Sequence, residues 1–138
     1  MRILVFDNDA RTREVLVQRM RGRGFEADSA QTAAEAIDQM TSSKYDVVLV
    51  EIVMPHDAFA AITSWMRSVT ALPRIVVMSG VAELWRRANP GVHVAGVLQK
   101  PFSIEEVIRV VGSPQGPVKV HFKTTARRPQ KIAQRDDS

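Results

Sequence analysis

The 138-residue sequence contains no cysteine, so the chain can form neither a disulfide nor a zinc site with thiolate ligands. It has no apolar run near the ~20 residues that a transmembrane helix requires. The N-terminus has no apolar signal region, because residues 2–6 form only a short apolar stretch that leads into acidic residues. These absences predict a cytoplasmic protein with no membrane partner.

The sequence also lacks a glycine-rich phosphate-binding loop, which argues against the nucleotide-binding proteins that use one. It shows no internal repeat. Its length suffices for one domain with a real hydrophobic core and is too short for two. We therefore expect a single domain.

The charge is distributed unevenly. Residues 1–111 contain 13 basic and 13 acidic residues, which cancel, whereas residues 112–138 contain six basic and two acidic ones and carry the whole net charge of +4. We therefore expect a domain at 1–111 and a basic, flexible tail at 112–138, with too few apolar residues to fold alone. The alternation around Val120 allows a short strand at 118–122. An alternative role for the tail is an arm that binds nucleic acid, an acidic partner or a cyclic dinucleotide, and its candidate residues are Arg127, Arg128, Lys131 and Arg135.

The chain is organised around one apolar run. Val47 to Val50 are four consecutive aliphatic residues, which predicts a strand covered on both faces, as in a parallel sheet. We expect Val48 and Val50 to be buried by helices on opposite faces. The run ends at Glu51, and Pro55 soon prevents it from continuing as an interior strand.

Strand and helix patterns alternate five times along residues 1–111. Apolar runs predict strands near 3–6, 25–29, 47–50, 75–78 and 94–98. Amphipathic patterns predict helices near 10–23, 33–40, 59–69, 83–88 and 104–111. Thr32 with Glu35, and Ser103 with Glu106, form two predicted capping boxes. This order predicts an α/β, flavodoxin-like, doubly wound (βα)5 fold with a five-stranded parallel sheet.

Polar residues stand at the predicted carboxyl ends of four strands, where open α/β sheets bind their ligands. They are Asp7, Asn8, Asp9, Glu51, Ser79 and Lys100. Taken singly, each is an ordinary turn, cap or solvated residue. Together they offer hard oxygen ligands for Mg²⁺, a hydroxyl for a phosphoryl oxygen and an ammonium that neutralises growing charge. The set therefore indicates a site for a divalent cation and a phosphoryl group.

Four motifs at these strand ends carry a family resemblance. They are residues 3–9 with their acidic cluster, residues 48–55 with Met54-Pro55, the Ser79-Gly80 step and the Lys100-Pro101-Phe102 turn. On these motifs residues 2–111 resemble the receiver domain of bacterial response regulators, of the single-domain chemotaxis type. In that family the Lys–Pro peptide of the turn is usually cis.

The resemblance implies a signalling protein of a two-component or phosphorelay system that is not an enzyme and whose partner is a histidine kinase or another signalling protein. It places the phosphoacceptor at position 51, a phosphoryl-sensing hydroxyl at Ser79, the family's lysine at Lys100 and the switch residue at Val97. The implied Mg²⁺ ligands are Asp7, Asn8, Glu51 and the backbone carbonyl of Val53.

Several positions depart from the family pattern. Position 51 is Asp in the family, position 8 is a metal-binding carboxylate and position 97 is aromatic, and the usual glycine is missing from residues 56–59. The longer Glu51 overshoots a nucleophile position that must be met in line, and a misplacement of this order can cost ~10²-fold in rate. Asn8 brings no charge, so we expect weak Mg²⁺ binding.

Glu51 is long enough to reach toward Lys100 and Ser79 and to stand in for a phosphoryl group. We therefore expect a degenerate receiver that acts through protein contacts without ordinary aspartyl phosphorylation. Two alternatives stay open: a receiver that is phosphorylated normally, and a binder of nucleic acid or cyclic dinucleotide that works through its tail.

Overall fold

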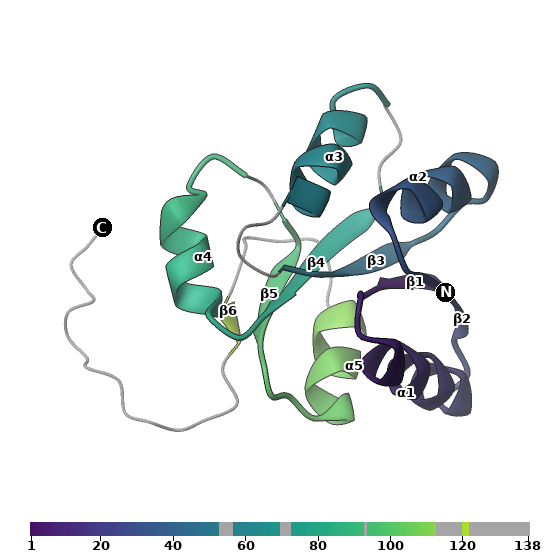
Figure 1. Ribbon diagram of the computed structural model, residues 1–138. Coiled ribbons are helices and arrows are strands. Elements are labelled where there is room, and N and C mark those ends of the chain that lie inside the picture. The colour runs from purple at the N-terminus through teal and green to yellow at the C-terminus, as the bar shows by residue number, and fades with distance from the viewer. Residues whose placement is uncertain (53–56, 70–72, 93, 113–119, 122–138) are drawn as a thin grey trace, which may run out of the picture.

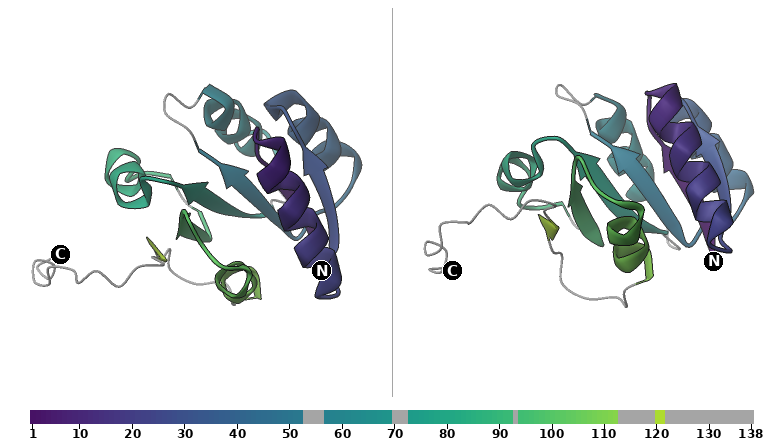
Figure 2. Two further views of the ribbon diagram at one scale, coloured as in Figure 1. Left: turned by 60° about the horizontal axis from the view of Figure 1, so that its bottom comes forward. Right: turned by 90° about the horizontal axis from the view of Figure 1, so that it is seen from below.

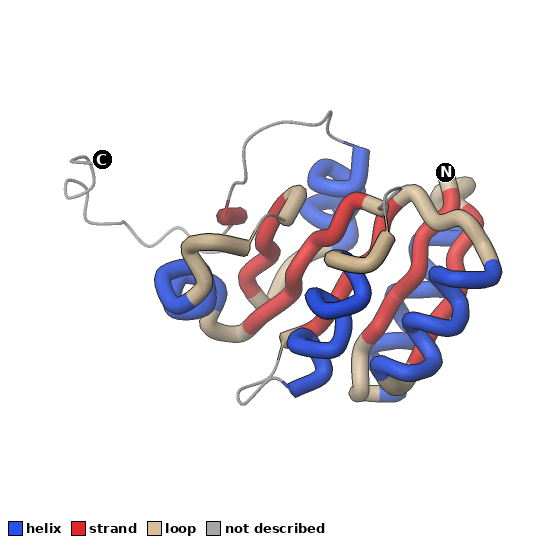
Figure 3. Tube along the Cα trace, turned by 90° about the horizontal axis from the view of Figure 1, so that it is seen from above, coloured by secondary structure: helices blue, strands red, loops and turns tan. Residues whose placement is uncertain are grey.

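The computed structural model describes residues 1–52, 57–69, 73–92, 94–112 and 120–121. Its core is one parallel sheet with the strand order β2-β1-β3-β4-β5-β6, which Figures 1 and 3 show from two sides. The strands are β1 (Arg2–Phe6), β2 (Glu26–Ala30), β3 (Val47–Glu51), β4 (Arg74–Ser79), β5 (Gly96–Gln99) and β6 (Val120–His121). The helices are α1 (Ala10–Gly22), α2 (Ala33–Ser42), α3 (Asp57–Met66), α4 (Ala82–Ala88) and α5 (Ile104–Gly112).

The predicted α/β fold is confirmed, with five parallel strands and five helices in alternation. The sixth strand, β6, has two residues and pairs in parallel with β5 at Val97 and Leu98 (Figure 1). It lies inside the stretch where the alternation of residues 118–122 allowed a short strand. The division into a domain at 1–111 and a tail at 112–138 stays a prediction, because most of the tail lies outside the described residues.

Helices lie on both faces of the sheet (Figure 2), and a cluster of buried apolar side chains fills the layer on each face. Helices α1 and α5 cover one face, while α2, α3 and α4 cover the other (Figure 1). In β3, Val47 and Leu49 pack in the first layer, whereas Val48 and Val50 both pack in the second. The expectation that Val48 and Val50 face opposite layers was therefore wrong. Side chains two residues apart on a strand point to the same face, so the change of face falls between neighbours.

Side-chain caps fix where several helices begin. Asp9 caps α1 by accepting from the amide of Thr12, and Thr32 caps α2 by accepting from the amide of Glu35. At the start of α5, Ser103 Oγ accepts from the Glu106 amide at 3.1 Å, and Glu106 Oε1 in turn accepts from the Ser103 amide at 2.8 Å. The second predicted capping box is thus complete. In the first, Glu35 instead accepts from the amide of Gln31.

Candidate functional site

Because all the strands are parallel, the carboxyl ends of β1, β3, β4 and β5 meet at one edge of the sheet, which we call the rim. Asp7 follows β1, Glu51 ends β3, Ser79 ends β4, and Lys100 follows β5. The rim therefore receives side chains from stretches of the chain that lie far apart in sequence. The Lys100–Pro101 peptide is cis, as the family resemblance implied.

Lys100 holds two acids of the rim together. Its Nζ lies 3.0 Å from Glu51 Oε2 and 3.5 Å from Asp7 Oδ2. The Asp7 side chain is fully buried, Glu51 is 12% exposed and Lys100 is 26% exposed. The predicted approach of Glu51 to Lys100 is therefore present in the structure. This ion pair is largely shielded from water, which strengthens its attraction relative to a surface pair.

The two acids affect each other's protonation. Burial, followed by a hydrogen bond with Glu51, raises the pKa of Asp7 to about 6. Burial works against ionisation of Glu51 too, but hydrogen bonds with Asp7 and Lys100 outweigh it and hold the pKa of Glu51 below its ordinary value. Asp7 is therefore the first of the pair to take up a proton as the pH falls.

The other two residues of the acidic cluster, Asn8 and Asp9, are both exposed. Asp9 accepts from the amide and the hydroxyl of Thr12, and these hydrogen bonds lower the pKa of Asp9. Asp9 thus caps α1, whereas Asp7, Glu51 and Lys100 form ion pairs that we call the charged cluster of the rim.

Ser79 and Val97 are both fully buried. Ser79 Oγ accepts from the amide of Val81 at 3.0 Å, so the hydroxyl is bonded to its own loop. Val97 packs in the layer of α2, α3 and α4. Their roles as phosphoryl sensor and switch stay predictions. Val53, predicted to offer a backbone carbonyl to the metal, lies outside the described residues, as do the tail residues Arg127, Arg128, Lys131 and Arg135.

The acids fit a divalent cation only in part. Apart from the contact between the two acids and the 3.5 Å approach of Lys100 to Asp7 Oδ2, the buried oxygens Asp7 Oδ2 and Glu51 Oε1 have no hydrogen-bond partner among the described residues, so both keep lone pairs for a cation. Lys100 already supplies positive charge to both acids. In the described ranges no group of three or more His, Cys, Asp or Glu side chains is placed to hold a metal ion. The donor set is therefore short of the anionic oxygen ligands that Mg²⁺ prefers.

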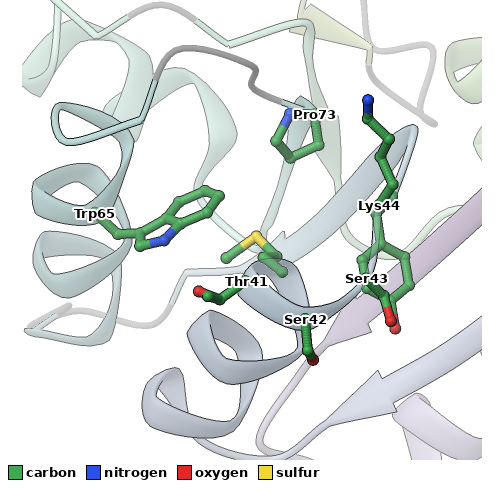
Figure 4. A pocket seen from close by; sticks show the side chains of 8 residues that line it. Thr41, Ser42, Ser43, Lys44, Trp65 and Pro73 are labelled. Atoms are coloured by element: carbon green, nitrogen blue, oxygen red, sulfur yellow. The ribbon is translucent and has the colours of Figure 1, made fainter.

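Two surface hollows lie away from the rim. One, of about 370 Å³, is lined by α2, the α2–β3 connection, Trp65 and Pro73 (Figure 4). Lys44 and Tyr45 precede β3 and Pro73 precedes β4, so this hollow is at the opposite edge of the sheet. The other lies between α1 and α5. Neither touches the charged cluster.

Sequence reasoning missed two residues that shape the rim. Arg13 donates from Nη1 to the backbone carbonyl of Asp7 at 2.7 Å. The Gln99 side chain hydrogen-bonds the Gly80 carbonyl and the Ala82 amide, just beyond Ser79. Arg13 is one turn beyond the Asp9 cap, so its reach back to Asp7 could have been anticipated from helical spacing. A glutamine before a Lys-Pro step carries no such signal.

Comparisons with known proteins match most of the chain to one family. The response regulator receiver domain family matches residues 3–112. Response regulator MprA of Mycolicibacterium vanbaalenii is 30% identical over 109 residues, which cover 78% of this chain and 47% of the relative. The chain thus spans about half the length of the curated relatives it matches.

Solved structures show the same fold. The receiver domain of Francisella response regulator 1452 aligns with a TM-score of 0.69 at 22% identity, over 79% of this chain and 92% of that one. Response regulator TrrA of Thermotoga maritima, in complex with Mg²⁺ and BeF, aligns with a TM-score of 0.64 at 24% identity, over 80% of this chain and 95% of that one. No helix in the described part of the chain is long and apolar enough to cross a membrane.

Proposed function

The chain belongs to the response regulator receiver domain family, and on that premise we propose that it is a degenerate receiver. Receiver domains are signalling modules of two-component systems and interact with histidine kinases and other signalling proteins. This one signals through protein contacts, without ordinary phosphorylation of an aspartate and without an enzymatic activity of its own. Its partner is a histidine kinase or another protein of such a pathway.

The observation that carries the proposal is the ion pair between Glu51 and Lys100. A phosphoacceptor carboxylate needs a free oxygen in line with the incoming phosphorus, and a nearby cation must be available to the transferring group. Here Glu51 Oε2 and Lys100 Nζ are 3.0 Å apart, so the cation is already engaged by the acceptor itself, and the other oxygen, Oε1, is buried. Glu51 also carries one methylene more than the aspartate of the family. Both features lower the reactivity of position 51 toward a phosphoryl donor.

Weak Mg²⁺ binding belongs to the same proposal. TrrA was solved with Mg²⁺ and BeF, so a relative of this fold takes up the metal with a phosphoryl mimic. In this chain Asp7 and Glu51 would be its carboxylate ligands, and the metal would supply charge neutralisation. The ammonium of Lys100 between these acids, together with the exposed neutral Asn8, supports a lower affinity.

Intact-mass measurement after incubation with acetyl phosphate and Mg²⁺ tests the proposal. Wild type should gain no phosphoryl group. Glu51→Asp alone should do little, because the metal site is still one charge short, and Asn8→Asp alone should restore metal binding without acceptance. The double variant should accept, since both defects lie in one coupled site. Adding Lys100→Ala to it should abolish acceptance.

Glu26→Asp makes the same chemical change at an exposed position and serves as the control. Phosphorylated wild type would overturn the proposal in favour of an ordinary phosphorelay receiver. An inert double variant would mean that further changes, such as the missing glycine at 56–59, also disable acceptance. The tail's predicted anion binding is separate, and its loss on truncation with a steep dependence on salt would establish it.

A further inference from the structure

Helix α4 begins without a cap from its own residues. Val81 occupies the N-cap position, and its side chain makes no capping hydrogen bond. The helix has only seven residues, and so short a helix is not stable through its internal hydrogen bonds alone. Two amides at its start are bonded from outside instead. Val81 N–H donates to Ser79 Oγ at 3.0 Å, and Ala82 N–H donates to Gln99 Oε1 at 3.0 Å.

The Gln99 side chain makes two further bonds. Its Nε2 donates to the carbonyl of Gly80 at 2.8 Å and to the carbonyl of Lys100 at 2.8 Å. One amide group thus uses its oxygen and both of its protons. It ties the loop between β4 and α4 to the turn between β5 and α5.

Lys100 is the point where this network meets the charged cluster. Its backbone amide donates to the Ser79 carbonyl at 2.8 Å, and its carbonyl accepts from Gln99. Its side chain reaches Glu51 at 3.0 Å. A shift of the Lys100 backbone would therefore move the carbonyl that Gln99 Nε2 binds, and Gln99 Oε1 binds the Ala82 amide at the start of α4.

We propose that Gln99 is a positioning residue that couples the Glu51–Lys100 pair to helix α4. When Lys100 is held by Glu51, all three bonds of Gln99 form and α4 is capped. When a partner or ligand draws Lys100 away, the cap weakens and the start of α4 opens. This coupling goes beyond the proposed function, because it assigns to Gln99 the connection between the ion pair and one particular helix.

Helix α4 and its N-cap carry exposed apolar side chains. Val81 is 44% exposed and Leu84 is 56% exposed, two of the large apolar side chains most open to solvent in the described structure. On the other side of α4, Trp85 is only 1% exposed and packs in the core. Opening of α4 would therefore change both the exposed apolar surface and the environment of an indole.

Trp85 makes the capping step measurable. In a Trp65→Phe background it is the sole tryptophan, since the chain contains two. Gln99→Ala should make Trp85 more accessible to acrylamide quenching and speed amide exchange across residues 82–88 by about fivefold, the usual effect of losing one cap. Gln39→Ala is the matched control, because the Gln39 amide bonds the Ser29 carbonyl at 2.9 Å on β2, far from α4. Unchanged quenching and exchange in the Gln99 variant would overturn the proposal.

A second variant separates coupling from simple capping. Gln99→Glu retains an acceptor for the Ala82 amide but loses both donor bonds, so it should keep α4 largely closed while disconnecting it from Lys100. Glu51→Gln removes the charge that holds Lys100 and should speed exchange across 82–88 when Gln99 is present. In the Gln99→Glu background the same change should have no further effect. Equal effects of Glu51→Gln in both backgrounds would overturn the coupling. Neither measurement uses acetyl phosphate. A negative result for the Gln99 coupling therefore does not contradict the proposed function, and phosphorylated wild type would not contradict the coupling.

Discussion

The interior of β3 and its carboxyl end follow different rules, although they are one strand. Val47 to Val50 are completely buried between two layers of helices, whereas Glu51 stands at the rim beside Lys100. In the interior, size and apolarity decide which residue is tolerated. At the rim, a carboxylate can become longer or lose its charge without disturbing the packing below it. We therefore expect the changes predicted from the sequence at positions 8 and 51 to leave the fold intact.

The largest expected effect comes from placing a charge in the interior. Val50→Asp should abolish soluble folding, because an unpaired buried charge belongs to the few mechanisms that cost more than about 4 kcal/mol. Solubility and circular dichroism would measure this, with Val50→Ala as a control that should fold with a lower melting temperature. A soluble Val50→Asp protein that melts cooperatively would show that the interior of the strand tolerates a charge as the rim does, and would contradict the comparison.

A smaller effect should come from the contact between β5 and α5. A Cβ added at Gly96 would lie 2.8 Å from Cγ1 of Val110, so the Val110 side chain or α5 itself would have to shift. Gly96→Ala should lower the free energy of unfolding by about 1–3 kcal/mol, as overpacking typically does. Urea denaturation would measure it. In a Val110→Ala background the same change should cost much less, and an equal cost there would rule out this clash as the cause.

At the rim, removing a charge should stabilise the fold. The pKa of Asp7 is raised to about 6 from 3.8, so its contribution to stability is complete below about pH 4 and is lost as the pH rises through 6. The pKa of Glu51 is lowered instead, so its contribution to stability is complete above about pH 4.5 and is lost as the pH falls below that value. Asp7→Asn should therefore raise the free energy of unfolding by about 1–2 kcal/mol at pH 7.5.

Thermal melting at pH 5 and pH 7.5 in EDTA would measure this gain. Wild type should lose stability between the two values, and the Asn variant should lose less. If Asp7→Asn instead lowered the melting temperature at pH 7.5, the attraction to Lys100 would outweigh the burial of Asp7. The rim would then resemble the interior in depending on its native residue for stability.

The smallest effect should come from removing residues 113–138. Strand β6 pairs with β5 through only two residues, so its loss should lower the melting temperature by no more than a few degrees. Calorimetry of the shortened chain would show this. A large loss would mean that the last strand belongs to the interior and that the domain does not end near residue 111.

Much of the fold could be predicted because a strand buried on both faces is a continuous run of apolar residues in the sequence. The run at Val47–Val50 identified the central strand, and the parallel arrangement then implied that Glu51 and Lys100 meet. The face assignment of Val48 and Val50 was wrong because strand periodicity was not applied within the run. The bonds of Gln99 could not be predicted, since they depend on the local path of two loops and not on a pattern of residue types.

A double-mutant cycle on Glu51 and Lys100 tests the central claim most directly. The free energy of unfolding would be measured by urea denaturation for wild type, Glu51→Gln, Lys100→Met and the double variant, with Arg23 and Glu105, an exposed ion pair, as the control cycle. If Glu51 and Lys100 hold each other, the cycle should give a favourable coupling energy of about 1–3 kcal/mol, above that of the exposed pair. Effects that simply add, within about 0.5 kcal/mol, would show that Glu51 and Lys100 do not hold each other and would contradict the account.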